Sequence, residues 1–95
     1  MTETEFQSNV RAAEQFRRYA KYPEAEFWGG YIRGLRSHYH GERFGTDNEH
    51  EIWSAMADNH GGDSARYIRG IGYRAGFEGI SIQSAMNVLN QEGFK

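Results

Sequence analysis

The sequence has no cysteine, a single proline and only two lysines among its 95 residues. The absence of cysteine excludes disulfide bonds, thiolate metal sites and a cysteine nucleophile. It also favours an intracellular protein, because small secreted domains are often held together by disulfides. No apolar run approaches the roughly 20 residues that a membrane-spanning helix needs, and the polar stretch 1–10 lacks the apolar core of a signal peptide. We therefore expect a cytoplasmic protein with no membrane partner.

Aromatic side chains, in contrast, are abundant. They make up 15% of the sequence, with six Phe, six Tyr and two Trp, and 38% of all residues are hydrophobic. Large rings bury much apolar area each, which a short chain needs in order to form a core, and they are also frequent at interfaces. Length and composition together predict one folded domain over residues 1–95.

Turn and capping signals divide the chain into five segments with helical periodicity. Thr2 with Glu5, and Thr46 with Glu49, have the spacing of capping boxes, and Ser81 suits the start of a further helix. The expected helices cover residues 2–21, 23–40, 46–59, 64–78 and 81–93. The predicted fold class is therefore all-α, a compact bundle of four to five short helices. Its expected core consists of bulky side chains on the apolar faces: Trp28, Leu35, Trp53, Ile71, Met86 and Leu89.

The second predicted helix contains three glycines, Gly29, Gly30 and Gly34, on the side opposite its aromatic face. Glycine is costly inside a helix, so either another backbone packs closely against this side or the helix is irregular. Such packing can occur within one chain or between two copies, which leaves a homodimer open. The tetrapeptide at 31–34 recurs at 67–70, which is consistent with duplication or with chance.

Charged residues follow one another in blocks: 31–44 is mainly basic, 45–63 is acidic without Lys or Arg, and 64–77 is basic again. The acidic block predicts a surface that imitates a run of phosphates and occupies a basic groove on a partner protein. The alternatives are a solvated face, or internal pairing with the arginines on either side. The carboxylates expected to bind the partner are Asp47, Glu49, Glu51, Asp58 and Asp63.

The arginines indicate an alternative function: the protein is a small regulator that binds nucleic acid. Arginines and rings that share a helix face can grip phosphates and stack on bases. The net charge of −2 argues against this interpretation, because nucleic-acid-binding domains are usually basic. The residues expected to act here are Arg33, Arg36, Arg66, Arg69 and Tyr73.

The histidines suggest a third possibility, a metal-dependent enzyme built around His40, His50 and His60. No ligand spacing such as H-E-x-x-H is present, and surface or helix-end histidines explain the same residues. We therefore expect no catalytic residue, no metal and no cofactor.

A set of residues between 27 and 76 forms a pattern that is found in other proteins. It consists of Tyr31, Arg33-Gly34-Leu35-Arg36, Tyr39-His40-Gly41, Phe44-Gly45-Thr46, Glu49-His50, Trp53, Arg69-Gly70, Gly72-Tyr73-Arg74 and Gly76. This pattern resembles a family of uncharacterised small proteins from bacteriophages and proteobacterial prophages. The resemblance implies a protein of a bacterial host cell that binds and disables a host protein or ribonucleoprotein machine, as anti-CRISPR proteins do. Combined with the acidic block, it predicts a host-machine inhibitor that blocks a nucleic-acid-binding surface.

Overall fold

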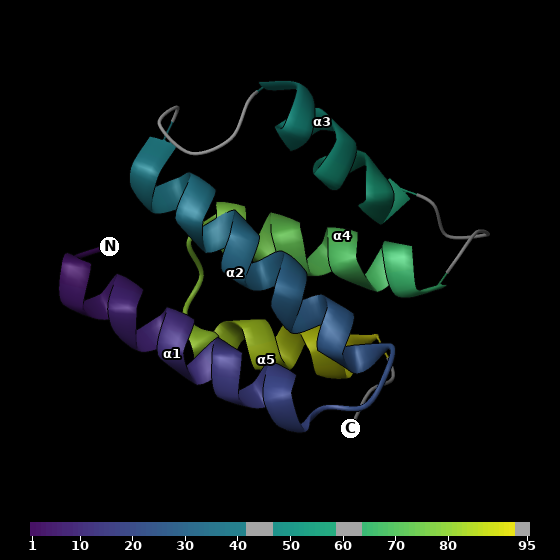
Figure 1. Ribbon diagram of the computed structural model, residues 1–95, viewed down its shortest axis with the longest axis horizontal. Coiled ribbons are helices and arrows are strands. Elements are labelled where there is room, and N and C mark those ends of the chain that lie inside the picture. The colour runs from purple at the N-terminus through teal and green to yellow at the C-terminus, as the bar shows by residue number, and fades with distance from the viewer. Residues whose placement is uncertain (42–46, 59–63, 93–95) are drawn as a thin grey trace.

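A computed structural model describes residues 1–41, 47–58 and 64–92. These ranges contain helices and no strand, which confirms the predicted all-α bundle. Within them, every helix is too short or too polar to cross a membrane. The elements are α1 (Glu3–Tyr19), α2 (Glu24–His40), α3 (Asp47–Ala55) with a following 3₁₀ turn η2 (Met56–Asp58), α4 (Ser64–Phe77) and α5 (Ile82–Gln91) (Figure 1).

Side-chain caps set two of the helix starts, as the sequence predicts. The Oγ1 of Thr2 accepts the backbone N–H of Glu5 at 3.1 Å, and the Oγ of Ser81 accepts that of Ser84 at 3.2 Å. Each bond satisfies a donor that the first turn of a helix leaves without a partner. The other predicted cap, Thr46, lies outside the described residues.

Glycine ends α4 in the expected place. Gly79 has a φ of +74°, its N–H donates to the carbonyl of Gly76 at 2.9 Å, and the N–H of Ile80 donates to Ala75 at 3.3 Å. This pair of bonds is a Schellman motif, which turns the chain sharply toward α5. The predicted third helix differs from the structure, because α3 ends at Ala55 and tightens into η2 instead of continuing to residue 59.

The centre of the fold is the pair α2 and α4, which touch backbone to backbone. A Cβ atom on Gly30 would overlap the carbonyl oxygen of Arg69, and one on Gly34 would overlap that of Tyr73. Because the contact advances along both helices in the same sense, the two helices are parallel. The close-packing explanation for these two glycines is therefore correct. Gly29 differs, since the atoms nearest to a Cβ at this position belong to the side chain of Arg17 and lie at ordinary contact distances.

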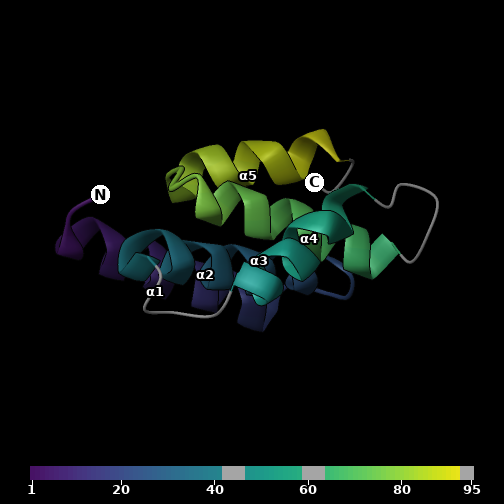
Figure 2. The same cartoon turned by 90° about the horizontal axis from the view of Figure 1, so that it is seen from above.

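The glycines of α4 make the reciprocal contacts. A Cβ on Gly72 would overlap the carbonyl oxygen of Phe27, and one on Gly76 would overlap that of Tyr31. The absence of side chains at these glycines thus lets the two helix backbones approach each other closely. The carbonyl oxygens lie near Cα–H groups, a geometry typical of weak hydrogen bonds. Around this pair, α3 covers one edge, and α1 and α5 cover the opposite edge (Figures 1 and 2).

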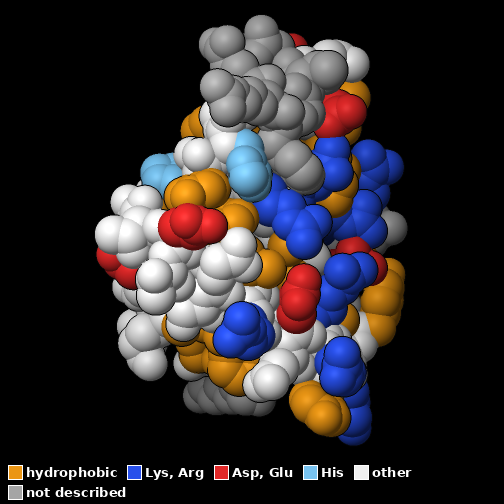
Figure 3. Space-filling view, turned by 60° about the vertical axis from the view of Figure 1, so that its left-hand side comes forward, with side chains coloured by type: hydrophobic (Ala, Val, Ile, Leu, Met, Phe, Trp, Pro, Cys, Tyr) orange, Lys and Arg blue, Asp and Glu red, His pale blue; other side chains and the backbone are white. Residues whose placement is uncertain are grey.

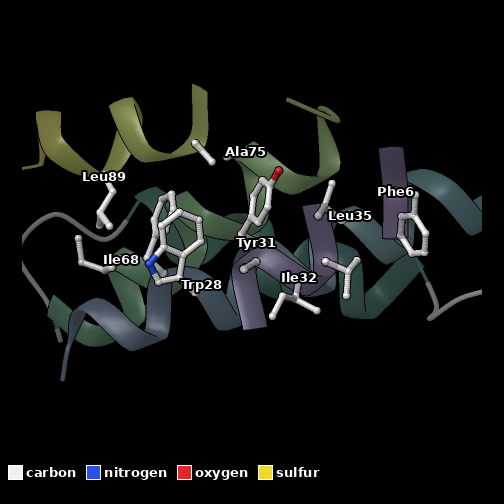
Figure 4. Packing of buried hydrophobic residues seen from close by; sticks show 12 residues of the cluster. Phe6, Trp28, Tyr31, Ile32, Leu35, Ile68, Ala75 and Leu89 are labelled. Atoms are coloured by element: carbon white, nitrogen blue, oxygen red, sulfur yellow. The ribbon is translucent and has the colours of Figure 1, made fainter. Parts of the chain in front are cut away.

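The hydrophobic core forms between α1, α2, α4 and α5. Trp28 and Leu35 of α2 and Leu89 of α5 are buried there, as predicted (Figure 4). Ile71 and Met86 are only partly buried and pack against this cluster. The prediction for Trp53 is wrong: this ring is half-buried and lies outside the core cluster.

Tyr31 is fully buried in this core and makes a hydrogen bond at its ring tip. Its hydroxyl donates to the carbonyl of Ile80 at 2.6 Å, which ties α2 to the turn that follows α4. Burial raises the pKa of Tyr31 to about 12, because the anion would lose its hydration. The ring is therefore a neutral hydrogen-bond donor at physiological pH.

Candidate functional site

Four arginines from three helices meet in one open groove, here called the arginine groove. It has a volume of about 340 Å³ and lies where α1, α2, α3 and α4 approach one another. The residues at positions 26, 29, 33 and 36 of α2 line the groove together, because their spacing of three or four places them on one helix face. Figure 3 shows Lys and Arg side chains gathered along one side of a molecular face, with acidic side chains among them. The lining residues are Arg17, Glu26, Gly29, Ile32, Arg33, Arg36, Trp53 and Arg69.

Carboxylates hold two of these guanidinium groups in place. Arg69 donates from Nε to Oε2 of Glu26 at 2.7 Å, and its Nη2 lies 2.6 Å from the same oxygen. Arg33 makes a short ion pair with Glu49 of α3. The four side chains remain between 30% and 45% exposed. At such exposure an ion pair contributes at most about 1 kcal/mol, so these carboxylates orient the arginines without locking them.

The other two arginines are held more loosely. Arg36 lies 3.8 Å from a carboxylate oxygen of Glu14, near the limit of an ion pair. The Arg17 guanidinium lies across the second helix, with its Nε 3.6 Å from the position that a Cβ of Gly29 would take. Arg17 is not among the site residues predicted from the sequence. A signal was present, because 15–23 contains Arg17, Arg18 and Lys21 and no acidic residue.

Trp53 of α3 forms the aromatic wall of the groove. The guanidinium carbons of Arg33 and Arg69 lie 5.0 and 5.6 Å from its ring centroid, within cation–π range. These two arginines occupy matching positions in the tetrapeptide that occurs at 31–34 and again at 67–70. Each occurrence therefore provides one guanidinium group that lies against the same ring. Its place among cations explains why Trp53 lies outside the core.

The other residues of the predicted nucleic-acid surface are not in the groove. Arg66 is exposed on α4 and does not line it. Tyr73 is only 2% exposed, because α3 covers it, and its hydroxyl lies 2.8 Å from Nδ1 of His50. A ring so enclosed cannot stack on a base, so the role expected for Tyr73 does not fit its burial.

The predicted acidic surface is partly used inside the chain. Glu49 pairs with Arg33, and Asp58 accepts a bond of 2.9 Å from Arg74. Internal pairing, one of the alternatives from the sequence, therefore accounts for these two carboxylates. Glu51 is exposed on the outer face of α3. Two other predicted groups, Asp63 and the side chain of Asp47, lie outside the described residues.

The histidines take part in ring and hydrogen-bond contacts. His38 Nδ1 lies 2.9 Å from the carbonyl oxygen of Phe77, and the His40 ring meets Phe6 edge-on at 5.5 Å. Among residues 1–41, 47–58 and 64–92, no three His, Asp or Glu side chains are grouped so as to hold a metal ion. His60 lies outside these ranges.

Elsewhere, the pKa of Tyr67 is raised by burial and by the negative charge of Glu92, which accepts a bond of 3.2 Å from its hydroxyl. This contact joins α4 to the end of α5, and neither residue lines the arginine groove. No family model matches the chain, and neither a curated protein nor a solved structure shows significant similarity to it. The chemistry of the arginine groove is therefore the strongest guide to function.

Proposed function

We propose that this protein binds nucleic acid through the arginine groove, with the guanidinium groups contacting phosphates. The observation that carries the proposal is the convergence of Arg17, Arg33, Arg36 and Arg69 beside Trp53. Guanidinium presents planar, paired donors that match a phosphate, and it is hydrated more weakly than the ammonium of lysine. Arginine and tryptophan in one groove suit a ligand that has both phosphates and bases.

The overall charge of −2 does not prevent such binding, because the groove is locally basic. Its lining contains four arginines and one glutamate. Glu49 and Glu14 pair with two of these arginines, so the group as a whole keeps an excess of one positive charge. The ion pairs with Glu26 and Glu49 are partly exposed, so a phosphate can replace each carboxylate at a cost of about 1 kcal/mol or less. In the free protein, these carboxylates orient the arginine side chains, and a bound phosphate takes their place.

The test is a binding titration with a labelled oligonucleotide at several salt concentrations. With up to four phosphate contacts, the affinity should fall with salt at a logarithmic slope of about −2 to −3. Arg36→Ala and Arg17→Ala should each weaken binding severalfold and flatten the slope by about 0.7. Arg11→Ala is the matched control, because Arg11 is an exposed arginine of α1 that does not line the groove. Absence of binding at low salt would refute the proposal.

The outer face of α3 favours a second candidate, inhibition of a host protein machine by docking, in the manner of anti-CRISPR proteins. Asn48, Glu51, Ile52 and Ala55 are all exposed at the spacing of one helix face, and Ile52 is 49% exposed. An apolar centre beside a carboxylate suits a partner whose surface is basic with an apolar patch. The acidic-surface mechanism would then rest on Glu51, because Glu49 already pairs within the chain.

A pull-down from bacterial lysate separates this candidate from the first. A partner that docks on α3 should be lost with Glu51→Lys combined with Ile52→Asp, and retained with Glu3→Lys on α1. Retention of the same partner by both variants would count against docking through α3. Loss of capture after nuclease treatment would point back to nucleic acid.

A further inference from the structure

We infer that the nucleic acid bound in the arginine groove is single-stranded and that one of its bases stacks on Trp53. This inference rests on the proposed function and specifies its ligand. It follows from three properties of the groove: the position of Trp53, the size of the groove, and the charge of the helix that forms its outer wall.

The position of Trp53 places an aromatic ring among cations. Its ring is half-buried, lines the groove, and has the guanidinium groups of Arg33 and Arg69 within 6 Å of its centroid. Successive nucleotides offer a phosphate and a flat base at short spacing, which matches guanidinium groups around a ring. Only a single strand presents the face of a base, because a duplex keeps its bases stacked on each other.

The volume of the groove also favours a single-stranded ligand. About 340 Å³ is at the lower end of the range for small-molecule sites and suits a nucleotide unit. A duplex is recognised differently, by an element that projects into its major groove. The four arginines line the arginine groove, so they can contact a ligand that lies inside it.

The wall formed by α3 opposes duplex binding. This helix contains no Lys or Arg between Asp47 and Ala55, and Glu51 and Ile52 are exposed on its outer face. A helix of this kind repels the phosphates that border a major groove. Its contribution to binding is therefore the inward-facing Trp53, not its outer surface.

Binding requires only rearrangements of partly exposed side chains. Arg33 and Arg69 lie against the Trp53 ring and also bind Glu49 and Glu26. When a phosphate takes over each guanidinium group, the ring face becomes available to the neighbouring base. The backbone contact between α2 and α4 is unaffected.

Intrinsic fluorescence of the unmodified chain provides a direct test, because the protein has two tryptophans in different surroundings. Trp28 is 1% exposed in the core, so a ligand in the groove can reach only Trp53. Single-stranded oligo(dT) should quench part of the emission, since stacked bases quench indole. An abasic strand of equal length should bind through its phosphates without this quenching, and a duplex should bind more weakly than the single strand.

Substitution of the ring supplies an independent test. Trp53→Leu should reduce the affinity for oligo(dT) by about five- to hundredfold, the range for loss of one stacked base, and leave the affinity for the abasic strand unchanged. Trp53→Phe keeps a flat ring and should recover much of the loss. Circular dichroism checks that both variants fold.

The outcomes distinguish this inference from the proposed function. Equal affinity for duplex and single strand, with no quenching of the unmodified chain, would overturn the single-strand inference and leave nucleic-acid binding intact. Binding of neither form at low salt would overturn both. If Trp53→Leu fails to fold, the quenching comparison still decides the question.

Discussion

Gly30 of α2 lies directly against the carbonyl oxygen of Arg69 in α4, and there is no space between them for a methyl group. Its neighbour Gly29 faces the side chain of Arg17 at an ordinary contact distance. Two adjacent glycines of one helix therefore have opposite structural roles, and the same substitution should affect them differently.

Gly30→Ala should lower the free energy of unfolding by about 1–3 kcal/mol, because the added methyl group forces α2 and α4 apart. Gly29→Ala should leave it unchanged or raise it by about 0.5–1 kcal/mol, since alanine is the better helix former. Urea denaturation of both variants measures the difference. Equal effects would contradict the backbone contact between the two helices.

The buried hydroxyl of Tyr31 predicts a loss of stability in alkali. Its pKa is raised to about 12 in the folded protein, above the ordinary value of 10. The folded state therefore holds this proton more tightly, and the associated stability is fully present below pH 10 and is lost as the pH rises toward 12. The total loss from Tyr31 should be about 2–3 kcal/mol.

Denaturation curves at several pH values from neutrality to pH 12 test this effect. Tyr31→Phe should reduce the alkaline loss, at a cost near neutrality of about 1 kcal/mol for the hydrogen bond to Ile80. Tyr19→Phe, which alters an exposed ring, should leave the alkaline loss in place. If the Tyr31→Phe profile matched that of the original chain, another group would be responsible.

Removing a carboxylate from the arginine groove should strengthen nucleic-acid binding. Glu26→Gln leaves Arg69 without its charged partner and makes the groove more basic, so the affinity for an oligonucleotide at low salt should rise severalfold. The free energy of unfolding should change by no more than about 1 kcal/mol, because the pair is partly exposed. The control is Glu3→Gln on α1, for which the affinity should stay within twofold, about the resolution of the titration.

The contact between His50 and the buried hydroxyl of Tyr73 should show in a double-mutant cycle. His50→Ala leaves that hydroxyl without its partner and should cost about 1–3 kcal/mol, whereas Tyr73→Phe removes the hydroxyl itself and should cost less. In the double variant, the cost of replacing His50 should shrink by about 1 kcal/mol. Strict additivity of the two changes would show that the hydrogen bond contributes nothing.

Local chemistry was enough to predict most helix ends. The hydroxyls of Thr2 and Ser81 and the turn at Gly79 act within a few residues of themselves, so their sequence context determines what they do. For Gly30 and Gly34, which are costly inside a helix, the sequence left two alternatives, close packing of a backbone or an irregular helix, and the structure shows the first.

The surroundings of individual side chains were less predictable, because they depend on distant segments. Trp53 has the periodicity of a core residue, yet guanidinium groups from two other helices reach its ring. Tyr73 shares a helix face with Arg66 and Arg69, yet α3 packs against Tyr73 and covers its ring while Arg66 stays exposed. The groove itself joins residues from 17 to 69, and no local pattern brings them together.

The parallel course of α2 and α4 means that the chain must travel back along the molecule before α4 can begin. The contacts of α3 and η2 follow this return, since His50 of α3 meets Phe77 and Met56 of η2 meets Gly70. Among the described residues, α3 contributes no side chain to the central hydrophobic cluster. The exposed positions of α3, such as Glu51 and Ile52, can therefore change without altering the helix pair. We expect evolution or design to vary ligand preference there while the glycines of α2 and α4 stay fixed.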